Sequence, residues 1–396
     1  MLRLAQTYGD AVLALKIKDY VTVTAAHDGW ETVTFGDTLN MATGIGDLAP
    51  QRQPNDPLAD ENKPKMSAWM GTRTAREKLD GSFSYGKYPW GAGEVLRYNS
   101  TQTFVLAAAM DSFLKRQAGP TAHLWDMVVA EVFQPIGVFH APMMHTQETD
   151  GGRGIPHLLH GLYPTIDDVA KLTTLLQNGG QHQGQQLLHA ATLARALYKT
   201  AAMGLPTGGQ NRFGEARYHL SFWSVPYRTA NGCFLQIPYM AGFGGNLVVL
   251  LPNGISAFRF ADGNNFDVES MVLAGAALRP FPCATGSEEK PPPHQRQPLT
   301  ASELHTEFPD NTFYTGPVHM FPASGGVLYG TRKDDLDVGT WRITPDGHYC
   351  RQWHVWDGQR QRCYTVFREG ERFELYVQER WGKVVLRRVP GNPEGY

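Results

Sequence analysis

Residues 91–114, GAGEVLRYNSTQTFVLAAAMDSFL, decide the fold of this chain. A polar loop ending in Tyr98-Asn99-Ser100 runs directly into an apolar segment, which we expect to form a long helix. Asn99 is a favourable N-cap, and Gln102 three residues further on predicts a capping box. Because the residues that follow are almost all apolar, the helix is expected to be buried on all sides. The sequence therefore holds a tyrosine and small polar side chains at the start of a rigid element.

Length and charge limit the classes of protein that this chain can represent. At 396 residues it is longer than one hydrophobic core usually supports, so two domains are expected. The formal net charge is −2, with acidic and basic residues interspersed, so no nucleic-acid partner is expected. No apolar run approaches the length of a membrane span. The N-terminal residues lack the apolar core and cleavage site of a signal peptide.

The order of predicted elements favours an α+β fold in the first part of the chain. Helical patterns dominate up to about residue 200, and a last apolar helix is predicted at 268–278. Segments of strand composition lie between these helices, at 218–225, 233–238, 246–251 and 255–260. Strands that are grouped late, with helices before and after them, predict an antiparallel sheet flanked by helices.

The composition changes sharply after residue 282. Residues 283–298, CATGSEEKPPPHQRQP, read as a proline-rich, extended linker. Beyond it, short aromatic and β-branched runs alternate with Asp-Gly and Gly turns, which predicts a small all-β domain, a meander or a barrel. The expected division is a first domain at 1–282, the linker, and a β domain at 299–396.

The chain has four cysteines, too few for a disulfide scaffold, and only one pair is suggestive. Cys350 and Cys363 flank the turn Asp357-Gly358 almost symmetrically, so they can face each other across a hairpin. A disulfide there would imply an oxidising compartment. Two reduced, half-buried cysteines are the alternative, and the sequence leaves both open.

Several segments of the first domain, taken in order, resemble the penicillin-recognising serine hydrolases. This family includes class C β-lactamases, D-aminopeptidases, related esterases and 6-aminohexanoate-dimer hydrolases. Tyr98-Asn99-Ser100 resembles the family's Tyr-x-Asn/Ser loop. LKIKDYV at 15–21 and WETVTFGDTLNMATGIGD at 30–47 resemble, in order and spacing, the segments that follow its nucleophile helix. The stretch PYMAGFGGN at 238–246 resembles the Gly-x-Gly-Gly-Gln form of the aminohexanoate-dimer hydrolases.

The resemblance covers residues 1 to about 282 and implies a β-lactamase-like domain acting on amides or esters by acyl transfer. It implies that Tyr98 moves a proton and that Ser100 contacts lysine or substrate. The amide of Phe243, between Gly242 and Gly244, would donate to the oxyanion. No metal and no cofactor are implied. The structural alternatives are that Tyr98 only packs under its loop, and that the glycines only form a bulge between two strands.

One residue departs from the family pattern in a way that bears on the substrate. Met240 stands where many members of the family have Lys or His, which supplies positive charge for a β-lactam carboxylate. An esterase or amidase is therefore expected rather than a true β-lactamase.

The family's defining motif, a helical Ser-x-x-Lys, is not found at its expected place. Serine attacks in this motif, and lysine activates it from one helical turn away. In the family it lies at the start of the helix whose end residues 1–6 form, so we expect the pair shortly upstream of Met1 and a chain that lacks the N-terminal part of its domain, including two strands. Strand 255–260 would then be an open edge for self-association. Ser84-Tyr85-Gly86-Lys87 and Ser287-Glu288-Glu289-Lys290 fit the pattern literally but are expected to be chance matches.

Histidines are the other candidate ligands or catalytic groups. His140, His145, His157 and His160 lie close together in the sequence, but there is no His-Glu-x-x-His and no Cys-x-x-Cys. We expect solvated loop histidines and no metal site.

The sequence is compatible with two functions from different classes. The first is a serine hydrolase that is inactive as given, because the nucleophile is absent, and whose partner is a small amide or ester. The second is a non-catalytic binding protein, or a truncated gene product, that uses the same cleft and the β module. An in-frame Ser-x-x-Lys upstream of Met1 would favour the first. For a full-length parent we expect a periplasmic or secreted location.

Overall fold

The computed structural model describes most of the chain in two compact units. The described residues are 1–49, 61–211, 213–229, 231–263, 266–283, 297–315, 318–332, 335–370, 372–377 and 383–396. Unit 1 comprises Met1–Gly208, Ala216–Val225 and Gln236–Pro282, and unit 2 comprises Gly209–Glu215, Pro226–Leu235 and Cys283–Tyr396. The predicted linker lies largely outside the described residues, so its boundaries remain a prediction.

Helix α5, Ser100–Ala118, is the central helix of unit 1. Twelve of its 19 residues are buried, which confirms the prediction of a helix enclosed on all sides. The other helices of this unit are α1 (Leu2–Tyr8), α2 (Phe35–Leu39), α3 (Lys63–Gly71), α4 (Ala75–Phe83), α6 (Leu124–Val128), α7 (Ile166–Gln177), α8 (Ala190–Ala196) and α9 (Val268–Leu278). None of the helices in the described part of the chain is long and apolar enough to cross a membrane.

The capping box predicted at the start of α5 is wrong. The Asn99 side chain does cap the helix, by accepting from the Thr101 amide at 2.9 Å. Gln102 does not return a hydrogen bond to the cap. Its side-chain amide donates instead to the Ile45 carbonyl at 2.7 Å, because Gln102 is buried against that loop. The polar side chain thus joins two segments of the unit instead of closing the helix end.

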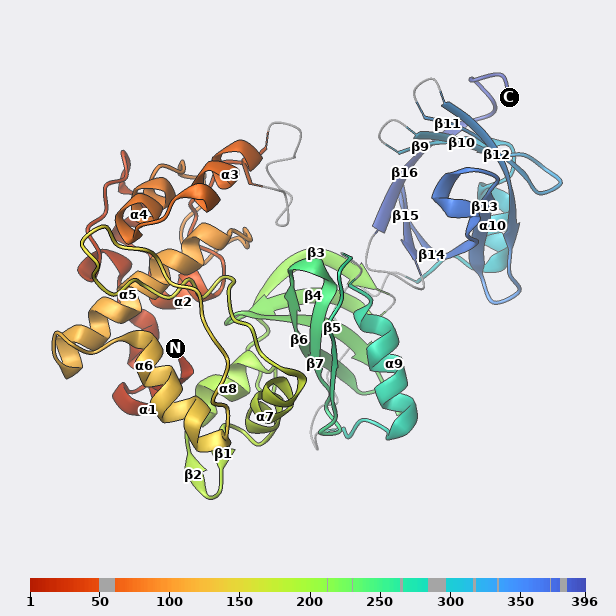
Figure 1. Cartoon of the computed structure of the whole chain (residues 1–396). Coiled ribbons are helices and arrows are strands. Elements are labelled where there is room, and N and C mark those ends of the chain that lie inside the picture. Colours follow the sequence, from red (N-terminus) through yellow and green to blue (C-terminus); the bar gives the residue numbers. More distant parts are fainter. Residues whose placement is uncertain are drawn as a thin grey trace. The chain divides into compact units, whose positions relative to one another are not determined.

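Six strands form a sheet in the order of the sequence. They are β3 (Leu205–Asn211), β4 (Gly214–His219), β5 (Phe222–Arg228), β6 (Phe234–Gly242), β7 (Asn246–Leu250) and β8 (Ser256–Arg259). The sheet lies between α9 and the helices of residues 1–196 (Figure 1), and α7 and α9 contact β8 and β7. This antiparallel sheet flanked by helices confirms the predicted α+β fold.

Two details of the sheet differ from the sequence prediction. Residues 218–225 are not one strand, because Leu220 and Ser221 adopt left-handed conformations, with φ of 46° and 72°, and turn the chain between β4 and β5. The glycine-rich strand β3 was not predicted. Its composition, LPTGGQN, has little β propensity, and pairing with β4 supplies the order that the composition does not.

Unit 2 contains a closed eight-stranded barrel, which confirms the predicted all-β domain. Its strands are β9 (Asn311–Thr315), β10 (Val318–Pro322), β11 (Val327–Arg332), β12 (Asp335–Ile343), β13 (His348–Trp353), β14 (Arg362–Glu369), β15 (Arg372–Val377) and β16 (Lys383–Pro390). Helix α10, Ala301–Glu307, precedes the barrel. Leu304 and Phe308 are fully buried in the core that contains Phe313, Tyr349 and Phe373. Closure pairs every strand with two neighbours and leaves no exposed edge.

Two disulfides join all four cysteines. Cys350 of β13 lies directly opposite Cys363 of β14, and the two form a disulfide. Of the two alternatives left open by the sequence, the disulfide is therefore the one observed. Cys233 and Cys283, which are 50 residues apart, form a second disulfide that the sequence analysis did not anticipate. The long separation hid this pair, because only the fold brings the two positions together. Two disulfides are typical of an oxidising compartment.

The end of the sheet in unit 1 supports a prediction about association. β8 is the last strand in the sheet order and, among the described residues, is paired only with β7. A fragment of residues 1–282 that carries Cys233→Ser is therefore expected to dimerise or aggregate through this edge, while residues 299–396 fold alone. Light scattering measures the oligomeric state of each fragment, and amide exchange measures the protection of its strands.

A lysine on the edge gives a matched test. Ala257→Lys places a charge on β8 and should shift the fragment towards monomer, whereas Thr174→Lys adds the same charge on the exposed surface of α7 and should not. A monomeric fragment with strong amide protection in 255–260 would contradict the prediction.

Candidate functional site

The loop that carries Tyr98 is fastened to the segment 41–46 by its backbone. Amide-to-carbonyl bonds join Gly46 to Gly86, Tyr88 to Gly44, Gly93 to Ala42 and Arg97 to Met41, at 2.7–3.0 Å. Gly44 has a φ of 72°, and a Cβ at this position would lie 3.0 Å from the Trp90 carbonyl. The segment 41–47, MATGIGD, therefore supports the loop that leads into α5. Glycine is needed at position 44, where the backbones of the two segments come close together.

Tyr98 lies against aromatic side chains of the sheet. Its ring centroid is 5.2 Å from that of Trp223 on β5 and 6.0 Å from that of Tyr218 on β4. The side chain is partly accessible, with 40% of the residue exposed. Burial against these rings raises the pKa of Tyr98 above its ordinary value, so the phenol is protonated at neutral pH. A protonated phenol at an open edge can donate a hydrogen bond or a proton to a bound group.

Ser100 is the first residue of α5 and follows the cap Asn99 directly. The helix start presents amides that have no partner within the helix, which favours an electron-rich group nearby. Ser100 is half-buried and lies two residues after Tyr98 in the chain. Tyr98 and Ser100 thus stand immediately before and at the start of the central helix of unit 1.

The residues predicted to bind the oxyanion form a hairpin. Gly242 ends β6 opposite Asn246, and Phe243 and Gly244 make the turn into β7. Gly244 has a φ of 83°, and the Phe243 carbonyl accepts from the Asn246 side chain at 2.7 Å. Phe243 itself is 92% exposed. The structure thus places these glycines at a hairpin tip, and a donor role for the Phe243 amide remains a prediction.

A row of aromatic rings runs from Tyr98 to β6, the strand that leads to the glycine hairpin. Trp223, which contacts Tyr98, also stacks on Tyr239 of β6, with centroids 6.4 Å apart and an interplanar angle of 23°. Tyr239 lies three residues before Gly242. The sequence analysis missed this row. Its only sign in the sequence was the aromatic content of the 218–225 and 233–240 segments.

The literal Ser-x-x-Lys at 84–87 does not form a catalytic pair. Ser84 is the C-cap of α4, and its hydroxyl donates to the Gly81 carbonyl at 2.7 Å. The Lys87 ammonium forms an ion pair with Asp28 at 2.8 Å. The two residues are on no common helix, so lysine is not placed to activate the serine. The second match, 287–290, lies outside the described residues.

Comparison with solved structures reveals similar folds. A match with a TM-score of 0.51 is the octameric penicillin-binding protein homologue from Pyrococcus abyssi, at 12% identity over 97% of this chain and 84% of that one. A putative 6-aminohexanoate-dimer hydrolase from Bacillus anthracis matches with a TM-score of 0.49, at 15% identity over 71% of this chain and 70% of that one. No family model matches the sequence, and neither does any curated protein.

The chain shares its fold with the penicillin-binding protein homologue from Pyrococcus abyssi. At these identities the likeness concerns the fold alone. Within unit 1, the Tyr98 loop begins the central helix and the glycine hairpin joins two strands of the sheet. The predicted site residues therefore come from the two layers of this fold, the helices and the sheet.

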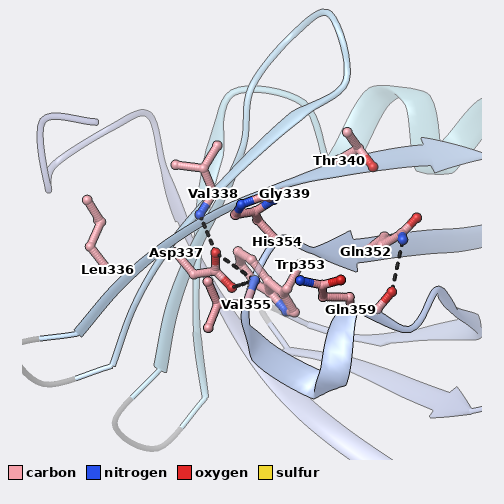
Figure 2. Close-up of a pocket in the computed structure, with 10 residues that line it drawn as sticks. All are labelled: Leu336, Asp337, Val338, Gly339, Thr340, Gln352, Trp353, His354, Val355 and Gln359. Carbon is pink, nitrogen blue, oxygen red and sulfur yellow. Dashed lines mark hydrogen bonds between the residues drawn. The ribbon is translucent and has the colours of Figure 1, made fainter.

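A pocket in unit 2 lies beside β12 and β13 of the barrel. It has a volume of about 610 Å³ and lies where the chain leaves β13 (Figure 2). The Asp337 carboxylate accepts from the amides of Val355 and Trp356, at 2.7–3.2 Å, so backbone donors already satisfy its charge. Leu336 and Val355 are more than half exposed. The lining offers apolar contact, the already satisfied Asp337 carboxylate and one imidazole, that of exposed His354.

The expectation of solvated loop histidines is wrong for His157. Only 7% of this residue is exposed, its ring packs on Phe104 of α5, and its Nδ1 lies 3.1 Å from His160 Nε2. Burial lowers the pKa of His157 to about 4, helped by the charges of His160 and Lys78. No group of three His, Cys, Asp or Glu residues among the described residues could hold a metal ion.

The burial of His157 predicts a loss of stability in acid. An imidazole with a pKa of 6.5 when unfolded and about 4 when folded binds more protons in the unfolded state, so stability is full above pH 6.5 and falls as pH decreases towards 4. At pH 5 the loss should be about 2 kcal/mol. Urea titrations of the whole protein between pH 8 and pH 5 measure it.

His157→Gln should flatten this pH dependence, because glutamine does not titrate. His140→Gln, which removes an exposed imidazole, is the matched control and should leave it unchanged. Equal slopes in the native protein and in His157→Gln would show that another group is responsible.

Proposed function

We propose that unit 1 binds a small amide or ester in a site of the serine-hydrolase type. In this site the Tyr98 phenol acts as the proton-transferring group, Ser100 contacts the ligand and the Phe243 amide faces the carbonyl oxygen. The observation that supports it most is the position of Tyr98, held at the start of α5 with its ring on Trp223 of the sheet. Acyl transfer in such a site needs a nucleophile close to Tyr98.

The proposed reaction is hydrolysis of the amide or ester through an acyl-enzyme. A serine hydroxyl would attack the carbonyl carbon, and lysine and Tyr98 would pass the serine proton to the leaving amine or alcohol. Water would then release the acid and restore the serine. In this scheme the residues of this chain would supply the proton-transfer and oxyanion groups. One Ser-x-x-Lys lies on a helix, Ser112 to Lys115 of α5, but its lysine is paired with Asp111 at 2.7 Å.

A second candidate is a binding protein that uses the same site without chemistry. The arrangement of Ser84 and Lys87 favours it, since both residues of the literal Ser-x-x-Lys at 84–87 are bound to other partners. Both candidates require that the ligand contacts Tyr98, so ligand binding is the first property to test.

Trp223 provides a spectroscopic test of binding. A linear amide, the 6-aminohexanoate dimer, should change the fluorescence of the native chain saturably, and Trp223→Phe should remove the change. Tyr98→Phe should weaken binding about fivefold to tenfold, as expected for one lost hydrogen bond. Hexanoate, which has no amide, is the matched ligand control. Binding that is absent, or equal in Tyr98→Phe, would refute the proposed site.

A further inference from the structure

Three aromatic side chains form a wall beside the start of α5. The ring centroids of Tyr98 and Trp223 are 5.2 Å apart, and the two rings are inclined by 32°. The centroids of Trp223 and Tyr239 are 6.4 Å apart, with an interplanar angle of 23°. The rings come from three segments of unit 1, the loop before α5, strand β5 and strand β6. Because each ring is close to parallel with the next, we treat Tyr98, Trp223 and Tyr239 as one surface, the aromatic wall.

A buried ring holds the aromatic wall in place. Tyr218 of β4 is 2% exposed and meets Tyr98 and Trp223 edge-on, at interplanar angles of 87° and 76°. Met41 and Leu96, which are both buried, belong to the same apolar cluster. The wall is therefore ordered before a ligand arrives, so a ligand that packs on it loses little free energy in ordering side chains.

The three rings of the wall are accessible, in contrast to Tyr218. Of Tyr98, 40% is exposed, and Trp223 and Tyr239 are half-buried. An aromatic ring that remains partly exposed offers apolar area to a ligand, and a second ring gains pairing free energy beyond the burial of that area.

The arginines nearest to the wall in the sequence have other partners. Arg217 and Arg228 each donate to a backbone carbonyl at 3.3 Å. Arg97 is 1% exposed, and its guanidinium lies over the rings of Tyr88 and Trp90. Strand β6 contains no Asp, Glu, Lys or Arg. The surface of the wall is thus aromatic, and it favours an uncharged group.

We propose that the aromatic wall binds an aromatic group of the substrate, next to the amide or ester that contacts Tyr98. This inference rests on the proposed function and names the substrate class, amides and esters that carry an uncharged aromatic ring. Rings that are close to parallel match a flat group, which packs on them in an offset stack. A quaternary ammonium is bound best where aromatic rings enclose it, and the wall presents one side only.

Three primary amides that differ in a single substituent test the proposal on the whole protein. Phenylacetamide should bind about threefold to tenfold more tightly than cyclohexylacetamide, which has the same carbon skeleton without the π-system. It should also bind more tightly than (trimethylammonio)acetamide. Calorimetry measures the three dissociation constants without any variant. Equal binding of the phenyl and cyclohexyl amides, or tightest binding of the ammonium amide, would overturn the proposal.

Variants assign the preference to the wall. Tyr239→Leu should reduce the phenyl preference at least by half, whereas Tyr163→Leu, which removes an exposed ring elsewhere in unit 1, should retain it. Tyr98→Phe keeps its ring, so it should weaken all three amides equally and leave the preference unchanged. A phenyl preference that is the same in Tyr239→Leu as in the native protein would show that the ring is bound elsewhere.

The same data separate this inference from the proposed function. If Tyr98→Phe weakens all three amides but the phenyl group gives no advantage, the site of the proposed function stands and the aromatic wall is refuted. If the phenyl preference depends on Tyr239 but Tyr98→Phe weakens no amide, the wall stands and the role of the Tyr98 hydroxyl is refuted. Absence of binding by all three amides would refute both.

Discussion

The purified chain is expected to hydrolyse p-nitrophenyl butyrate and nitrocefin at the uncatalysed rate. The physical reason is that no Ser-x-x-Lys match among the described residues has a lysine free to activate its serine: Ser84 donates to Gly81 and Lys87 is paired with Asp28, while Lys115, three residues after Ser112, is paired with Asp111. Loss of a nucleophile costs roughly a millionfold in the subtilisin example. A spectrophotometric assay of both substrates, with heat-denatured protein as the blank, measures the result.

The serine at 84 provides the decisive control for this experiment. Turnover that disappears in Ser84→Ala would show that the 84–87 motif is catalytic and that the expected result is wrong. Turnover that persists in Ser84→Ala but disappears in Tyr98→Phe would also contradict it, and would indicate a different nucleophile in the same site.

The second large effect concerns Tyr98 in a protein with a nucleophile. In a version extended before Met1 by a helix that carries Ser-x-x-Lys and restores hydrolysis, Tyr98→Phe should lower the acylation rate by about 10²–10⁴. Phenylalanine keeps the ring on Trp223 and Tyr218 but removes the hydroxyl that moves the proton. Single-turnover kinetics with p-nitrophenyl butyrate isolate the acylation step.

Stability separates a catalytic role from a packing role. The urea midpoint of Tyr98→Phe should match that of the parent, because the ring contacts are unchanged. Tyr163→Phe, which removes another exposed phenol, is the matched control and should keep full activity. An acylation rate that is unchanged in Tyr98→Phe would show that Tyr98 has only a packing role.

The sequence alone determined the kinds of element and their order. Apolar residues on all sides of 104–114 require a buried helix, and this holds for α5 wherever it packs. Thr165 and Asp168 predict the capping box that α7 shows, because that bond pattern is local. The Asp-Gly and Gly turns after residue 310 likewise indicate the strands of the barrel. Such features depend on residues a few positions apart, so sequence is sufficient.

Tertiary structure decided what distant residues do to one another. Gln102 looks like a cap residue, yet the fold brings the Ile45 carbonyl to it. Cys233 finds Cys283 only because the chain between them forms three strands and a helix. The Tyr98 ring contacts that of Trp223, 125 residues later in the chain. Each of these partners is chosen by packing free energy over the whole unit, which no local pattern contains.

Burial itself is the clearest case. His157 lies in a polar, glycine-rich stretch that predicts a solvated loop, but the fold presses it between Phe104 and His160, close to Lys78. Whether a side chain is solvated depends on everything packed around it. The local composition therefore predicts an exposed His157, whereas the folded protein buries it. The sequence determined which kinds of side chain unit 1 contains. The tertiary structure determined which of them are buried against one another.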